Sequence, residues 1–407
     1  MDGAAPPEQV RRPARRQARR IWLAVHLWTG LGLGGLFALL GLTGSVLVFY
    51  LDIDAAFNPA IRAAHAVAAP VSADAVHHRL RQAFPGRDGP WRIEMPLSPD
   101  SPVTARYYRP AERAGRSFAP LMVTLDPETL AVTSSRFWGD TAMTWIYDLH
   151  YSLLLDRAGV TLVGIAGLLA MVSLATGLYL WWPSRARFAA ALRPVPRAGA
   201  VRRNYDLHVI GGVYGLIVLA VVTLAGSALA LPETARSLVS AFSAPSPPPR
   251  LPAVPPLEES PPLSLDAAVA LAGQRFPGAE VRWIETSGAG GTPVSVRLHQ
   301  AFEPGRRFPR TQVWFHPATG AVLAIRDPAG NGGGDTVFDW LHPLHNGEAF
   351  GTAGRVLACI AGFLPLLLFV TGVIRWRQKV RAREKSRTAR PALERRVRPE
   401  HPGCARP

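Results

Sequence analysis

Four long apolar stretches constrain the fold of this chain more than any other feature of its sequence. They run from Ile21 to Leu51, from Ala158 to Trp182, from Leu207 to Leu231 and from Val356 to Ile374. Each has at least the roughly 18–20 residues that a helix needs to cross a bilayer. The first stretch is too long for a cleaved signal peptide, and no small-residue cleavage site follows it. The sequence therefore predicts four transmembrane helices.

The basic residues lie between and beyond these stretches. The chain has a net charge of +16, and segments 1–20, 183–204 and 375–407 together hold 24 Lys and Arg residues. Alternating helices place these segments on one side, which the positive-inside rule makes cytoplasmic. We therefore expect both termini on the cytoplasmic side of the membrane, with the lipid bilayer as partner. No basic groove with interleaved aromatic residues is present, so we expect no nucleic-acid partner.

Several motifs recur in the two halves of the chain, in the same order. The spacing of 18 residues from His26 to Gly44 recurs from His208 to Gly226, and the spacing of 26 from His150 to Thr176 recurs from His345 to Thr371. Between them, SADAV…RQAFPG at Ser72 resembles SLDAA…GQRFPG at Ser264. These matches predict two copies of one unit, which consists of a helix, an outer domain, a histidine and a second helix.

Each outer segment is predicted to have an α+β fold. A stretch with helical spacing stops at Phe-Pro-Gly, and the alternating runs VTARYY and VSVRLH follow, with D-P-E-T and H-P-A-T-G turns between strands. The proline-rich linker from Ser243 to Pro256 is predicted to be extended. The predicted segments are a basic N-terminus 1–20, helix 21–51, outer domain 52–140, histidine segment and helix 141–182, basic loop 183–204, helix 205–232, linker and outer domain 233–335, histidine segment and helix 336–376, and basic tail 377–407.

The motifs TWIYDLH to TGLYLWW and FDWLHPLH to TGVIRW, with the turns of the outer segments, resemble the PepSY-associated transmembrane helix family. The resemblance covers residues 20–377. It implies two periplasmic PepSY-like domains on four transmembrane α-helices, in a bacterial inner-membrane protein linked to iron uptake. It also implies a haem-bearing reductase that acts on ferric siderophores. PepSY units occur in peptidase-inhibitory contexts as well.

Two of the histidines lie inside predicted spans. Ionisable groups in a membrane are costly and usually have a partner or a task. His26 and His208 occupy equivalent positions in the two halves, near the cytoplasmic face, and two imidazoles facing one another suit the two axial positions of a haem iron. The alternative is that each is an interfacial histidine directed to lipid headgroups.

His150 and His345 form the second equivalent pair, at the outer ends of the second and fourth helices. His342 is extra, because its counterpart is Tyr147. It is a candidate ligand, hydrogen-bond donor or acid–base group, with His345 preferred as the ligand. We expect two b-type haems, since no C-x-x-C-H motif for covalent attachment is present. His150 lies roughly a dozen residues beyond a 20-residue span ending at Trp182, so either the outer domains cap this haem or the segment before Gly159 folds back.

The two histidine pairs predict a di-haem electron-transfer protein, and the family resemblance implies that it reduces periplasmic ferric siderophores. The sequence has no flavin or nicotinamide domain, so the electron donor would be quinol or a separate cytoplasmic reductase. GLGLGG at Gly30 lies within an apolar span and has no preceding strand, which excludes a dinucleotide fingerprint. Two alternatives stay open: a haem-free regulatory protein that restrains a peptidase or partner through its PepSY-like domains, and a siderophore or iron permease.

Overall fold

The structure is a computed structural model of the 407-residue chain, and it describes residues 7–66, 70–252, 254, 262–288 and 291–397. The ends of the two basic termini, residues 1–6 and 398–407, and the linker residues 253, 255 and 256 lie outside the described part. Close contacts divide the chain into two compact units. Unit 1 comprises residues 1–41, 169–217 and 363–407, and unit 2 comprises residues 42–168 and 218–362.

Four helical segments are long and apolar enough to cross a membrane. They are Arg16–Leu47, Asp156–Trp181, Ala200–Ala230 and Glu348–Thr388. Helices α1 (Pro7–Leu47), α5 (Asp156–Trp181), α7 (Ala200–Ala230), α11 (Gly351–Gly362) and α12 (Leu364–Val397) carry these segments. The prediction of four membrane-crossing helices is therefore confirmed by length and composition, and the chain is a multi-pass membrane protein.

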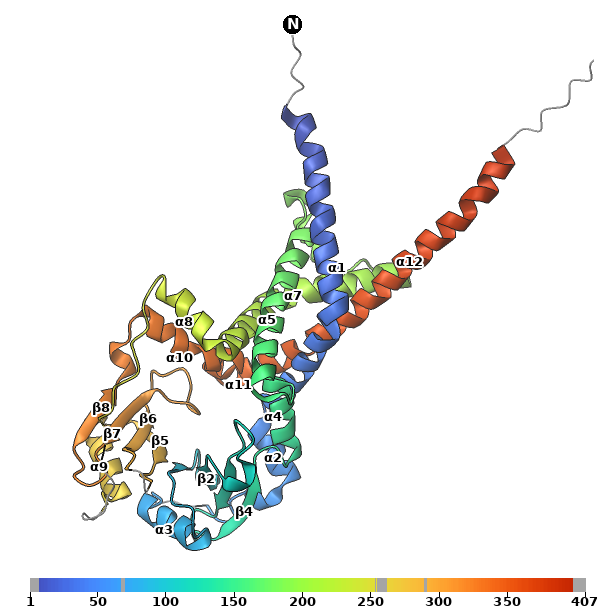
Figure 1. Cartoon of the computed structure of the whole chain (residues 1–407). Coiled ribbons are helices and arrows are strands. Elements are labelled where there is room, and N and C mark those ends of the chain that lie inside the picture. Colours follow the sequence, from blue (N-terminus) through green and yellow to red (C-terminus); the bar gives the residue numbers. More distant parts are fainter. Residues whose placement is uncertain (1–6, 67–69, 253, 255–261, 289–290, 398–407) are drawn as a thin grey trace, which may run out of the picture. The chain divides into compact units, whose positions relative to one another are not determined.

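Unit 2 contains a single eight-stranded antiparallel sheet with the strand order β4-β3-β2-β1-β5-β6-β7-β8 (Figure 1). The strands are β1 (Trp91–Glu94), β2 (Val103–Tyr107), β3 (Leu121–Leu125), β4 (Val132–Phe137), β5 (Glu280–Glu285), β6 (Val294–His299), β7 (Thr311–Phe315) and β8 (Val322–Arg326). Helices α3 (Ala73–Ala83) and α9 (Leu265–Arg275) pack on one face of this sheet. The core between them includes Val76, Leu80, Ile93, Ile284 and Val296, all fully buried. The predicted α+β region is confirmed.

The strand order reads the same from either edge of the sheet, with β1 and β5 paired in the middle. Helices α3 and α9 also cap one another. The Asp266 carboxylate accepts a hydrogen bond from the backbone N–H of Ala73 at 2.7 Å, and Asp74 accepts one from Leu265 at 2.8 Å. A carboxylate at a helix N-terminus satisfies donors that have no partner inside the helix. The two outer segments thus join in one sheet and one helical layer.

The helix that carries His150 does not continue into the membrane span. Helix α4 (Ala142–Ser152) ends at Ser152, and Leu153, Leu154 and Asp156 adopt left-handed backbone conformations with φ of 51°, 60° and 54°. The span α5 begins at Asp156, the last residue of this turn. In the second half, α10 (Gly333–His345) and α11 are separated by a comparable turn that contains Gly347 and Gly351. Of the two possibilities left by the sequence, the structure therefore has a break before Gly159.

Short helices complete the described chain. They are α2 (Tyr50–Phe57), α6 (Phe188–Ala191) and α8 (Pro232–Ser240), with 3-10 turns at Pro59–Ile61, Ala111–Arg113, Arg185–Arg187, Pro328–Gly330 and Glu348–Phe350. The described residues of the proline-rich linker, 243–252 and 254, have no helix or strand. This agrees with the expected extended linker, because proline lacks a backbone donor for either structure.

Candidate functional site

The four repeat-related histidines form two pairs, one within each unit. In unit 1 the ring centres of His26 on α1 and His208 on α7 are 6.2 Å apart. In unit 2 the ring centres of His150 on α4 and His345 on α10 are 6.0 Å apart. These are the pairs that the repeat spacing predicted to lie together.

Each of these histidines packs its ring edge against a glycine of another helix. A Cβ atom added to the glycine would lie within 3.4 Å of the histidine Cε1 in every case. The distances are 2.6 Å for Gly226 and His345, 3.0 Å for Gly44 and His150, 3.1 Å for Gly177 and His26, and 3.4 Å for Gly372 and His208. A Cβ atom would collide with the ring at Gly226 and crowd it at Gly44 and Gly177, so glycine lets the helices approach closely around these imidazoles.

The Nδ1 atom of every ring has an oxygen neighbour. Nδ1 lies 3.2 Å from Thr176 Oγ1 in His26, 2.9 Å from Thr371 Oγ1 in His208, 3.0 Å from Thr43 Oγ1 in His150 and 2.8 Å from the Val222 carbonyl in His345. A carbonyl can only accept, so Nδ1 of His345 carries the proton. Burial lowers the pKa of His345, although the Val222 contact acts in the opposite direction, and this shift favours the neutral ring. This tautomer leaves the Nε2 lone pair for a metal.

The separation of the rings fits an iron between them. An iron–imidazole bond of about 2 Å, with about 1 Å more to the ring centre, gives roughly 6 Å between two rings that share one iron. Among the described residues, no group of three or more His, Cys, Asp or Glu side chains is placed to hold a metal ion. A donor set of two imidazoles therefore suits a group that brings its own equatorial ligands, as haem does. His26 with His208, and His150 with His345, would hold the two haems.

His342 does not share in either ring pair. It lies on α10 one turn before His345, and its ring meets Phe308 edge-on with 4.3 Å between ring centres. Its Nδ1 lies 3.3 Å from the side-chain nitrogen of Asn346. Burial above all, and then the proximity of His345 and Arg307, lowers the pKa of His342 to about 3. His342 is thus a neutral, packed side chain at pH 7, which favours a supporting role over a charged one.

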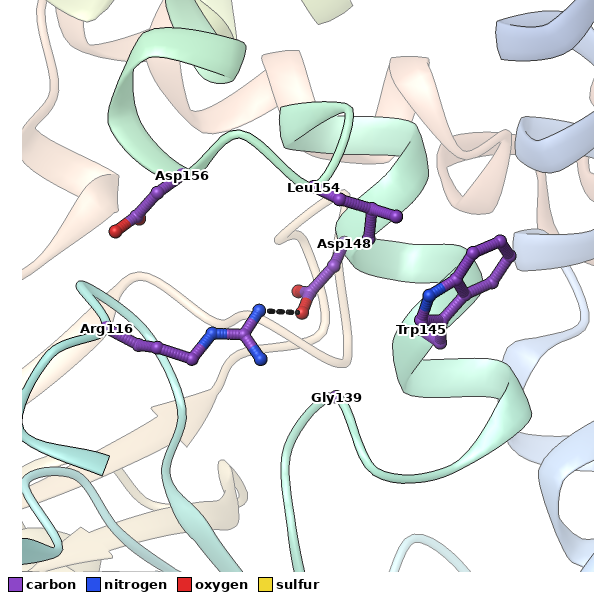
Figure 2. Close-up of a pocket in the computed structure, with 6 residues that line it drawn as sticks. All are labelled: Arg116, Gly139, Trp145, Asp148, Leu154 and Asp156. Carbon is purple, nitrogen blue, oxygen red and sulfur yellow. Dashed lines mark hydrogen bonds and ion pairs between the residues drawn. The ribbon is translucent and has the colours of Figure 1, made fainter. Parts of the chain in front are cut away.

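A cavity of about 440 Å³ lies beside the helix that carries His150 (Figure 2). Arg116 donates to Asp148 Oδ2 at 2.9 Å, and the indole nitrogen of Trp138 donates to Asp148 Oδ1 at 2.7 Å. Burial raises the pKa of Asp148, while the Trp138 and Arg116 contacts act in the opposite sense. These two bonds fix Asp148, two residues before His150, and so hold the helix that carries His150. The cavity is lined by Arg116, Gly139, Trp145, Asp148, Leu154 and Asp156.

Sequence reasoning missed how the glycines are used. Gly44 and Gly226 follow His26 and His208 in the repeat, yet in the structure they pack on the histidines of the second pair, His150 and His345. Only the repeated spacing of 18 residues could have indicated this, because it makes α1 and α7 each supply a histidine to the first pair and a glycine to the second pair. No sequence motif indicated the roles of Arg116 and Asp148.

Comparison with known proteins identifies the family. The family described as PepSY-associated TM region matches residues 23–379, nearly the whole chain. No curated protein matches the sequence. The chain belongs to the family of proteins with a PepSY-associated TM region.

Proposed function

We propose that the protein is an inner-membrane, di-haem b-type electron-transfer protein that reduces ferric siderophores on the outer side of the membrane. This proposal rests on the two pairs of imidazole rings, His26 with His208 and His150 with His345. In each, the ring centres are about 6 Å apart, every Nδ1 faces an oxygen acceptor and every ring rests on a glycine.

Each group of residues has a separate role in this proposal. The four histidines would supply the nitrogens that hold the haem irons, and the Thr and carbonyl oxygens at Nδ1 would orient the rings and increase their basicity. The glycines make room where two helices approach a ring. Haem, when bound, supplies one-electron chemistry between ferric and ferrous iron. Helices α1 and α7 bring a residue to both sites: α1 carries His26 and Gly44, and α7 carries His208 and Gly226.

The topology follows from the charge distribution. The basic segments would lie in the cytoplasm and the eight-stranded sheet in the periplasm, as the positive-inside rule requires. The symmetric strand order and the reciprocal caps of α3 and α9 support an origin by duplication. Electrons would enter from quinol or a separate cytoplasmic reductase. Reduction would release iron because hard oxygen ligands bind the ferric ion more strongly than the ferrous ion.

A stopped-flow experiment tests the proposal. The purified protein is reduced with dithionite, freed of excess reductant and mixed anaerobically with a ferric trihydroxamate complex in the presence of an iron(II)-specific chromophore. We expect the haem absorbance to return to the oxidised form while one iron(II) appears for each electron lost. Haem that stays reduced, with no iron(II) formed, would rule out reductase activity towards this complex. The His345→Ala variant serves as the matched control, because it lacks an outer ligand.

A further inference from the structure

Helix α8 begins directly after a membrane span. The span helix α7 ends at Ala230 and α8 begins at Pro232, so only Leu231 separates them. Leu231 has a non-helical backbone, with φ of −121° and ψ of 62°, and the chain therefore changes direction between the two helices. Proline suits the first position of α8, because its missing N–H would have no partner inside the helix there. The sequence thus holds α8 close to the end of the span.

Helix α8 has an apolar side and a polar side. Ala235, Leu238 and Phe242 are spaced three and four residues apart, which places them along one side of a helix. Phe242 lies in the turn that follows α8. Arg236 and Ser240 fall on the other side. The helix carries one acidic and one basic residue, so it has no net charge that would direct it to a charged partner.

The two bulky residues on the apolar side are exposed. Leu238 is 65% exposed and Phe242 is 92% exposed. Leu224 and Leu229, in the last turns of α7, are exposed as well. In a membrane span such residues contact lipid chains. The apolar surface of the span is therefore continued by that of α8.

The polar side of α8 is occupied by α10 (Figure 1). The Arg236 guanidinium lies 5.6 Å from the centre of the Phe338 ring on α10. Directly after Phe242, the Ser243 hydroxyl accepts a hydrogen bond of 2.9 Å from the backbone N–H of Gly334 at the start of α10. These contacts hold the chain on both sides of Phe242. The apolar side of α8 therefore faces away from α10.

A comparable short helix follows the first span. Helix α1 ends at Leu47, and α2, which begins at Tyr50, exposes Leu51 and Phe57. Asp54 of α2 is buried instead and pairs with Arg136. In both halves, a short helix that directly follows a span thus has one side on the protein and large apolar residues exposed.

We propose that α8 is an interfacial helix, which lies in the surface of the bilayer in the leaflet where α7 ends. Leu238 and Phe242 extend among the lipid chains, because exposure of a leucine and a phenylalanine to water is unfavourable. Amphipathic helices of this kind bury their apolar side about 5–10 Å into the boundary between headgroups and acyl chains. The membrane surface would thereby support α10, which carries His345. The inference depends on the membrane spans and not on the proposed haem chemistry.

The accessibility of spin labels tests this position of α8. The two natural cysteines are first removed by Cys359→Ala and Cys404→Ala. A nitroxide is then attached to single cysteines in the full chain, in nanodiscs of phosphatidylcholine. Its collisions with oxygen, which enters lipid, are compared with its collisions with a water-soluble nickel chelate. The labelled variants are Leu238→Cys, Phe242→Cys, Ser240→Cys and Val322→Cys.

Ser240 and Val322 provide the controls. Ser240 lies on the polar side of α8, and Val322 is a 53% exposed apolar residue of β8, which does not adjoin a span. We expect the labels at Leu238 and Phe242 to collide mainly with oxygen, at a depth of about 5–10 Å, and both controls to collide mainly with the chelate. Equal access of the chelate to all four labels would overturn the proposal, because α8 would then lie in water. Low access of both reagents to Leu238 and Phe242 would also overturn it, since protein would then cover the apolar side.

Discussion

At the scale of single residues, the contacts between histidine and glycine set the tightest limits on the structure. A methyl group at Gly226 would lie 2.6 Å from the His345 ring, a distance that forces the ring or the helix to move. At Gly372 the same methyl group would lie at 3.4 Å from His208, close to an ordinary contact. The two positions therefore predict different costs for one chemical change.

We expect Gly226→Ala to lower haem occupancy of the outer site strongly and Gly372→Ala to lower that of the inner site only slightly. Gly30→Ala in α1 is the matched control, because nothing lies within 4 Å of the added methyl group. Haem per chain and the reduced spectrum measure the effect. Equal haem content in all three variants would contradict the assigned packing.

The hydrogen bond at Nδ1 makes a second prediction at this scale. Thr371→Val keeps the shape of the side chain but removes the oxygen 2.9 Å from His208. Loss of such an orienting partner typically lowers metal affinity about 10–100-fold. We expect Thr371→Val to lose haem to a haem-scavenging protein faster than the parent protein does. Thr388→Val, which changes a residue outside this site, is the control and should lose haem at the rate of the parent protein. A rate unchanged in Thr371→Val would show that the threonine does not support the ligand.

The histidine pairs could be predicted from spacing alone, because equivalent positions of a repeat face one another when the halves associate. The glycines and oxygen atoms that contact these rings could not be predicted. Nothing in the residues near Gly44 distinguishes a glycine under an imidazole from one that only allows helices to pack. The oxygen at Nδ1 of His345 is a backbone carbonyl, which has no sequence signature at all.

At the scale of elements, the turn between α4 and α5 is the clearest site of backbone strain. Leu153, Leu154 and Asp156 have positive φ, a conformation that costs a non-glycine residue about 1–2 kcal/mol. The corresponding turn of the second half has glycine at positions 347 and 351. A leucine-rich sequence with no glycine or proline gives no signal for a helix break, so the sequence could not decide between a break and a continuous helix.

We expect Leu154→Gly to stabilise unit 2 by about 1 kcal/mol, since glycine adopts this conformation without strain. Leu154 is 41% exposed, so the side chain contributes little packing. The melting temperature of the detergent-solubilised protein reports the change. Leu155→Gly is the comparison: Leu155 does not have positive φ, and we expect this variant to be no more stable than the parent protein. A lower melting temperature for Leu154→Gly would argue against strain at this turn.

Asp126 gives a pH-dependent prediction for the strand turn that follows β3. Burial alone would raise its pKa, but hydrogen bonds from the Thr129 backbone and from His65 lower it well below its ordinary value of 3.8. A carboxylate whose pKa is depressed in the folded state stabilises the fold above its unfolded-state pKa and loses that contribution as the pH falls. We expect the thermal stability of the parent protein to decrease below about pH 4. We expect Asp126→Asn to be less stable at pH 7, with a stability that changes less as the pH falls. A parallel decrease in both proteins would contradict the assignment.

At the scale of the whole molecule, the apolar stretches and the strand patterns were sufficient to predict a four-helix membrane protein with an α+β region. The pairing of β1 with β5, through Ile93 and Ile284, could not be predicted. Each outer segment by itself has a complete alternating pattern. The sequence of an edge strand does not indicate which other strand pairs with it.

The measurement that tests the central claim most directly is a reduced-minus-oxidised spectrum of the purified protein, with haem quantified per chain, for the parent protein and His208→Ala. We predict about two b-type haems per chain in the parent protein and about one in the variant, with the outer haem spectrum retained. A colourless protein from cells supplied with haem, or a variant that loses both haems or neither, would contradict the assignment of the two histidine pairs.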